Sequence, residues 1–195
     1  MSLEHETFSV LICRKQSTSF NEINFLMQIA WSYAEKGLLV FILSGKVIDS
    51  ESGIDLNPYL SKPEVLQRII FRYISEPAGI LEWCHEMHKR SRLPHVFMLG
   101  GLETFTERNE FNAVEICAAL LDAVQYCSLC TRRNTYLLVS ICDNKSNNCP
   151  LHLITFFDQI LYLENSQTDS YTFLQLYPFT FPGEPLRKVE IKKNY

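Results

Sequence analysis

The chain has 195 residues, of which 47% are hydrophobic and 21% are charged, and its formal net charge is −4 at pH 7. This length and composition are typical of one globular domain with a single core, and they exclude a disordered or low-complexity chain. The slight excess of acidic residues argues against autonomous binding to a nucleic-acid backbone, which requires clustered lysine and arginine.

Strand and helix patterns alternate in the first half of the sequence. The apolar run at 7–13 predicts a buried strand, and Ser19–Glu22 fits a capping box that begins a helix ending at Gly37. The patterns that follow predict a second buried strand at 38–43, a loop at 44–62, and a turn of helix entering a strand at 65–73.

The run Val96–Leu99 is predicted to be the central strand, because it is short and apolar and ends at a glycine pair that starts at Gly100. Pro77 begins the helix before this strand. After it come a polar segment and then a long amphipathic helix that we expect to end near Arg133.

The last quarter of the chain contains short strand patterns without helices between them, which predicts an antiparallel extension of the sheet. We therefore expect an α/β fold in a single domain, with a mostly parallel sheet, helices on both faces and right-handed crossovers. The strands predicted after the central one are 135–141, 159–163, 171–177 and 189–191, with a core at about 7–142 and the antiparallel strands within about 157–195.

The turn after the first strand is where a nucleotide-binding protein of this class would carry a P-loop. A P-loop needs two glycines for close backbone approach to phosphate, a lysine for charge and a hydroxyl for Mg²⁺. Cys13 and Thr18 stand at the glycine positions, Ser19 at the lysine and Phe20 at the hydroxyl. The central strand ends at Gly100, where an acidic residue commonly holds magnesium. These substitutions predict a pseudo-ATPase, without a bound cofactor or metal.

Four segments in this order resemble the ATPase core of the RecA-type recombinase paralogues. They are 65–73 with the helix after it, 96–103, 118–127 and 137–140. The resemblance covers roughly residues 7–142, and it implies a RecA-like, P-loop-type fold and a location in the nucleus.

The resemblance also implies partners. Such a paralogue pairs with a SWIM-domain zinc-finger protein in the vertebrate Shu complex, and the pair supports assembly of a RecA-type recombinase on single-stranded DNA during homologous recombination repair. The expected function is therefore that of a non-catalytic subunit, with weak contact to DNA by the chain itself and no contact with a membrane.

Candidate contact residues come from two parts of the sequence. Arg132, Arg133 and Lys145 are the candidate contacts to DNA, although cations after a helix also complement its dipole. Phe179 and Phe181 lie in the most aromatic stretch of the chain and are the candidates for the partner interface.

Two alternatives remain open. In a divergent DNA-stimulated ATPase of the same family, Lys15 or Lys46 would replace the missing lysine. Glu103 is a candidate acid or base, but the sequence identifies no nucleophile beside it.

The second alternative is a zinc or redox module formed by Cys127, Cys130, Cys142 and Cys149. The spacing of Cys142 and Cys149 lacks the second close pair of a typical zinc site.

Overall fold

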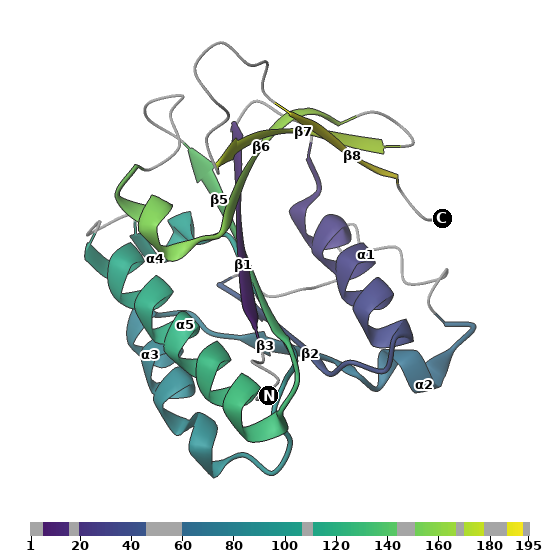
Figure 1. Ribbon diagram of the computed structural model, residues 1–195, viewed down its shortest axis with the longest axis vertical. Helices are drawn as coiled ribbons and strands as arrows, with labels where there is room; N and C mark the ends of the chain where they lie inside the picture. The colour runs from purple at the N-terminus through teal and green to yellow at the C-terminus, as the bar shows by residue number, and fades with distance from the viewer. Residues whose placement is uncertain are drawn as a thin grey trace, which may run out of the picture.

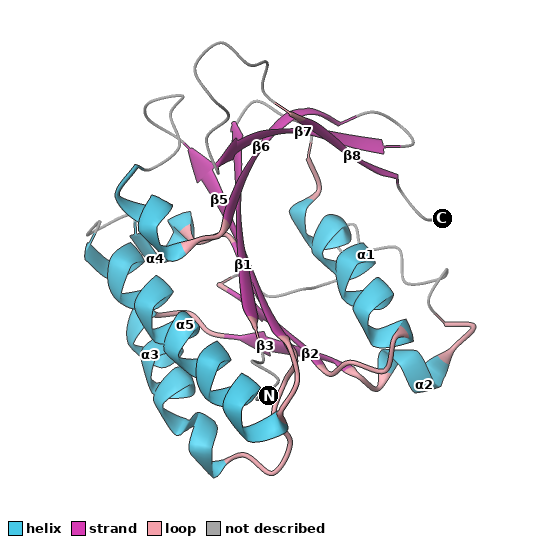
Figure 2. Cartoon of the chain, viewed as in Figure 1, coloured by secondary structure: helices cyan, strands magenta, loops and turns pink. Residues whose placement is uncertain are grey.

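The computed structural model describes residues 6–15, 20–45, 60–106, 111–143, 151–166, 170–177 and 187–192. These residues form an eight-stranded sheet with the strand order β3-β2-β4-β5-β1-β6-β7-β8. Helices cover both faces of the sheet (Figure 1), and the colouring by secondary structure shows the strands running between them (Figure 2). The predicted α/β class is confirmed.

The sheet is parallel from β3 to β6, and the last two strands are antiparallel. The strands are β1 Thr7–Lys15, β2 Val40–Ser44, β3 Ile69–Tyr73, β4 Val96–Gly100, β5 Thr135–Asp143, β6 Gln159–Ser166, β7 Ser170–Tyr177 and β8 Lys188–Lys192. The helices are α1 Glu22–Glu35, α2 Pro63–Leu66, α3 Pro77–His85, α4 Glu103–Thr106 and α5 Phe111–Thr131, with short 3-10 helices η3 Glu86–Lys89 and η4 Leu151–Phe156.

The parallel strands are buried on both faces, which explains their nearly continuous apolar sequences. Ile12 and Met98 face α1, whereas Leu11 and Phe97 face α3 and α5. The four side chains are at most 1% exposed. Figure 1 shows α1 on one side of the sheet and the pair α3 and α5 on the other, so each face has its own core.

The direction of β6 differs from the prediction. Residues 159–163 were expected to open the antiparallel extension, but β6 pairs in parallel with β1, and only β7 and β8 are antiparallel. The reason is a crossover, because η4 packs against α5 before the chain enters β6. Asp158 fixes the entry, since its Oδ2 accepts a 2.7 Å hydrogen bond from the backbone N–H of Ser9.

The start of α1 also differs from the prediction, although its end does not. The N-cap is Asn21, whose Oδ1 accepts a 3.0 Å hydrogen bond from the backbone N–H of Asn24. The capping box that was predicted to begin at Ser19 is therefore wrong, and Glu22 is the first helical residue. Gly37 ends the helix as expected, with a φ of 84° that favours glycine.

Helix α5 ends at Thr131, two residues before the predicted end, and α4 covers Glu103–Thr106, at the start of the segment for which the sequence indicated only a polar character. Asn112–Thr131 is long and apolar enough, by length and composition alone, to cross a membrane. In this fold 44% of that stretch is buried, and α5 packs against α3, β5 and η4 as a core helix.

Arg132 follows α5 in the left-handed backbone region, with a φ of 54°. Its N–H donates to the carbonyl of Ser128 at 2.9 Å, the arrangement in which glycine is strongly favoured after a helix. We expect Arg132→Gly to raise the free energy of unfolding by about 1 kcal/mol, because glycine has no Cβ to strain this conformation. Urea denaturation measures the change. Arg132→Ala, which removes the same charge but keeps a Cβ, should give no such gain, and equal gains in both variants would contradict the account.

Candidate functional site

The carboxyl ends of β1, β4 and β5 lie side by side, because β5 pairs with both of the other strands. Three charged side chains meet at this edge of the sheet. Arg14 comes from the end of β1, Glu22 from the first turn of α1, and Glu103 from the first turn of α4. In α/β proteins this edge is where ligands bind.

Arg14 shares its positive charge between two carboxylates. Its Nη2 lies 3.7 Å from Oε2 of Glu22 and 3.5 Å from Oε1 of Glu103. The three side chains are only 14–15% exposed, so solvent screens this cluster less than a surface ion pair. Arg14 Nε is buried and has no hydrogen-bond partner among the described residues.

Glu22 joins α1 to the two neighbouring strands. Its Oε1 accepts a 3.2 Å hydrogen bond from the backbone N–H of Gly101 and a second one from the hydroxyl of Ser140. The same Gly101 N–H also lies 3.2 Å from Oγ of Ser140. The carboxylate that would have completed a capping box is therefore used between elements instead.

Glu103 completes the cluster from the other side. Its Oε2 accepts a 2.8 Å hydrogen bond from the backbone N–H of Cys142, which fixes α4 to the end of β5. Burial, and next the nearby Glu22 carboxylate, raise the pKa of Glu103 above its ordinary value. Hence the site holds two acids in close proximity and one guanidinium that offsets their repulsion.

Gly100, the position of the expected magnesium ligand, is fully enclosed. A Cβ placed on this residue would lie 2.9 Å from Cδ1 of Leu26, a side chain of α1 that is 0% exposed. A side chain at this position would therefore require Leu26 to shift. The missing acid is thus accompanied by core packing that fills its place.

Phe20, at the position of the expected hydroxyl, belongs to an aromatic cluster. Its ring centroid lies 5.3 Å from that of Phe25 and 5.4 Å from that of Tyr171 in β7, and Phe25 also contacts Phe173. This cluster packs the start of α1 against the antiparallel strands. A magnesium-binding hydroxyl could not make these contacts.

The remaining P-loop positions are only partly described. Cys13 lies in β1 and is 0% exposed, where it packs in the core that faces α5. Thr18 and Ser19 lie outside the described residues, as does Lys46, whereas Lys15 is the last residue of β1.

The candidate DNA contacts are not gathered at this edge. Arg132 and Arg133 are exposed, and they precede β5 at the opposite end of the sheet from Gly100. Lys145 lies outside the described residues, as do Phe179 and Phe181, the candidates for the partner interface. Of these candidates the structure therefore describes only Arg132 and Arg133, which adjoin each other away from the cluster around Arg14.

The predicted cysteine set is also separated, apart from Cys149, which lies outside the described residues. Cys127 and Cys130 lie in the last turns of α5, near the start of β5. Cys142 lies seven residues after Thr135, the first residue of β5, which is roughly 23 Å at about 3.3 Å per residue. The described residues contain no group of three side chains that could hold a metal ion. Burial raises the pKa of the Cys127 thiol to about 12, so this thiol stays protonated.

Sequence reasoning missed the roles of Arg14, Glu22 and Ser140. One signal was present in the sequence. Arg14 and Glu22 flank the turn where P-loop glycines would stand, and Glu103 follows the predicted central strand. Because carboxyl ends of parallel strands meet, these charges were candidates to pair.

We expect Arg14→Gln to lower the free energy of unfolding by about 3 kcal/mol at pH 8, because it leaves two buried carboxylates without a cation. The loss should be smaller at pH 5. The pKa of Glu103 is already raised, and it rises further without Arg14, so at lower pH the protonated carboxyl no longer repels Glu22. Thermal denaturation at both pH values tests this, with Arg14→Lys as the charge-conserving control. An equal deficit at pH 5 and pH 8 would contradict the cluster.

We expect Gly100→Ala to destabilise the fold by about 1–3 kcal/mol, because its Cβ would crowd Leu26. Leu26→Ala alone should cost about 2–5 kcal/mol through the cavity that it leaves. The double variant should cost clearly less than the sum, since each change relieves the other, and chemical denaturation of all three measures the coupling. Additive losses would show that the two side chains do not compete for this space.

The sequence matches no protein-family model, and no curated protein matches it. Solved structures do match its fold. A DnaB-like replicative helicase, described with its interactions with primase, aligns with a TM-score of 0.58 at 11% identity, over 94% of this chain and 54% of that one. The chain therefore spans about half of that helicase. The flagellar accessory protein FlaH from Methanocaldococcus jannaschii aligns with a TM-score of 0.62 at 13% identity, over 94% and 84%. The chain has the fold of the RecA-like P-loop ATPases.

Proposed function

We propose that this protein is a non-catalytic RecA-like subunit that acts through protein partners and does not hydrolyse ATP. The observation that carries the proposal is the occupation of the nucleotide edge by the chain's own side chains. Arg14 is held by Glu22 and Glu103, and the expected positions of hydroxyl and acid are filled by packing.

Electrostatics supports the proposal. A nucleotide phosphate at this edge would approach two buried carboxylates, and the only described cation between them is already engaged. Phosphoryl transfer depends on positive charge placed around the transferred group. The end of β4 offers no side chain for magnesium, because Gly100 has none.

The partner assignment is supported by the resemblance of the four core segments to recombinase paralogues. On this ground we assign as partner a SWIM-domain zinc-finger protein, with a role in the nucleus in assembling a RecA-type recombinase on single-stranded DNA during repair. The net charge of −4 supports DNA contact that is made mainly by the complex.

Nucleotide binding and hydrolysis by the purified chain, alone and co-expressed with a SWIM-domain partner, test the proposal. With a fluorescent ATP analogue and Mg²⁺ we expect no saturable binding, and phosphate release should stay at the level of a protein-free control. Lys15→Ala is the matched variant, because Lys15 is the lysine at the end of β1, and it should behave as the unchanged chain does.

Three results would count against the proposal. Magnesium-dependent hydrolysis that is lost in Lys15→Ala would identify a divergent ATPase, and hydrolysis only in the complex would identify a shared site. Ser19→Ala should leave both co-purification with the partner and repair in complemented cells unchanged, so a loss of repair in this variant would show that the turn still performs chemistry.

A further inference from the structure

Helix α5 carries a line of exposed side chains along the side that faces away from the sheet. Five exposed residues recur at alternating spacings of three and four: Glu115, Ala118, Asp122, Gln125 and Leu129. This spacing keeps side chains in line along one side of a helix, here over about 21 Å at about 1.5 Å per residue. We call these five residues the α5 stripe, and no described residue covers it.

The two ends of the α5 stripe differ in charge. Glu115 lies near the start of α5, whereas Arg132 and Arg133 follow its last residue, and all three are exposed. None of them forms an ion pair with another described residue, and neither does Asp122. This order of charge suits the helix dipole, and it also leaves opposite charges unpaired at the two ends of one surface. Such a surface is complementary to a second copy of itself that runs in the opposite direction.

One register of an antiparallel second copy satisfies the middle of the stripe. A two-fold axis that passes between Asp122 and Gln125 sets these side chains opposite each other, where the amide can donate to the carboxylate. The same axis sets Leu129 opposite Ala118, so that a large apolar side chain packs over a small one. An axis at Asp122 itself would instead oppose two carboxylates and set Leu129 against Glu115.

The same register pairs the charged ends. Arg132 lies one further step of three residues beyond the stripe, so the axis that pairs its middle sets Glu115 opposite Arg132 of the other copy. Arg133 adjoins this position and gives the carboxylate a second cation. The two-fold symmetry repeats the contact, and each dimer therefore holds two such charge pairs.

Apolar surface lies at the same place. Leu129 is 75% exposed, and Tyr126, one turn before it, is 36% exposed. In this register the two side chains would lie over the region of Ala118 in the second copy and lose contact with water. Burial of apolar area supplies attraction that solvent-exposed ion pairs provide only weakly.

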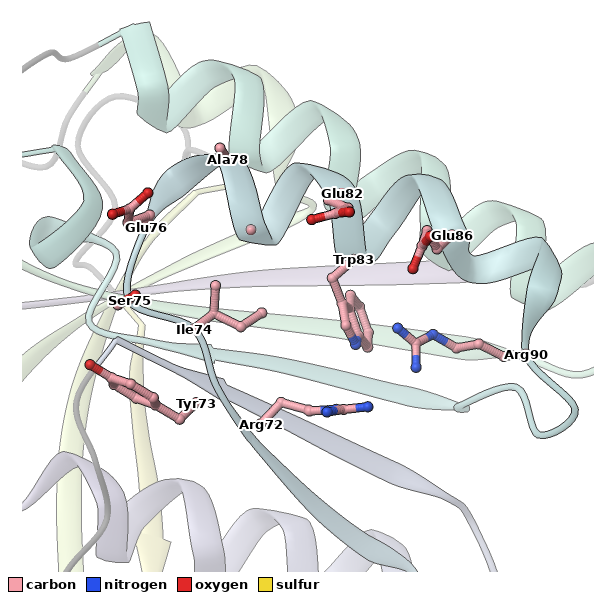
Figure 3. A pocket seen from close by; sticks show the side chains of 11 residues that line it. Arg72, Tyr73, Ile74, Ser75, Glu76, Ala78, Glu82, Trp83, Glu86 and Arg90 are labelled. Atoms are coloured by element: carbon pink, nitrogen blue, oxygen red, sulfur yellow. The ribbon is translucent and has the colours of Figure 1, made fainter.

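Helix α3 extends this surface. It packs beside α5, and Figure 1 shows the two helices together on one side of the sheet. Figure 3 shows the indole of Trp83 directed from α3 toward the strands, with Ala78 on the opposite side of the helix. The exposed residues Ala78, Glu82 and His85 again recur at spacings of four and three, with the acid before the histidine. A second copy would thus meet the same order of charge on both helices.

We propose that the chain forms a reversible two-fold dimer in which the α5 stripes of two copies pack antiparallel, with Glu115 of each copy facing Arg132 and Arg133 of the other. A second copy fits this stripe because each side chain along it lies opposite a complementary one about a single axis. The interface contains no member of the cluster around Arg14, so the dimer does not depend on whether the protein binds nucleotide.

Sedimentation equilibrium over about a hundredfold range of protein concentration tests the dimer. We expect the mass to rise from 22.7 kDa toward twice that value, and added salt to weaken the association by screening the end pairs. Glu115→Arg, and separately Arg132→Glu combined with Arg133→Glu, should each raise the dissociation constant about tenfold. An equal mixture of the two variants should associate about as tightly as the unchanged chain, because opposite charges then face each other at both ends.

The mixture also separates the interface from folding, since two unfolded variants would not restore each other. Glu190→Arg, the same charge reversal at an exposed position of β8, is the matched control and should leave the association unchanged. The proposal is overturned by a chain that stays monomeric at every concentration, by a mixture no tighter than either variant alone, or by equal weakening in Glu190→Arg. A monomeric chain that binds a single-stranded oligonucleotide through Arg132 and Arg133 would assign these arginines to nucleic acid instead.

Discussion

The single cation of Arg14 is the constraint on which the ligand edge of this fold depends. Glu22 and Glu103 are mostly buried, and two carboxylates can remain there only if a positive charge stays between them. The hydrogen bonds of these acids to Gly101, Ser140 and Cys142 then join α1, α4 and the ends of β4 and β5. In α/β proteins ligands bind at this edge, whereas here the chain's own side chains fill it.

Much of the fold follows from local sequence, because strands that are buried on both faces have continuous apolar sequences. From these runs alone, the predicted ends of β2 and β4 lie within two residues of the observed ends. Gly37 was also correctly predicted to end α1, where its positive φ favours glycine. Strand direction is different, since a short alternating run looks the same in parallel and antiparallel pairing. The parallel course of β6 comes from η4 and from Asp158, which binds Ser9 at a separation of 149 residues.

The site was predictable as a set of substitutions but not as an arrangement. That Gly100 lacks a carboxylate is visible in the sequence, whereas the side chain that fills its place, Leu26, is identified only by three-dimensional packing. Glu22 was assigned to a helix cap because the capping-box pattern considers only residues close in sequence. Its actual hydrogen bonds are with Gly101 and Ser140, which are distant in sequence. Sequence patterns also do not reveal that Trp83 Nε1 and Arg90 Nε are buried without a hydrogen-bond partner among the described residues, because burial and hydrogen bonding depend on the folded surroundings.

The place of β1 in the sheet has a consequence for biosynthesis. Among the described strands β1 comes first in sequence, yet it lies in the interior of the sheet, between β5 and β6. Its pairing partners, Thr135–Asp143 and Gln159–Ser166, therefore leave the ribosome long after β1 itself. Until then the apolar segment Val10–Cys13 has neither of these strands beside it, so the nascent chain must keep an aggregation-prone stretch unpaired while the intervening residues are synthesised.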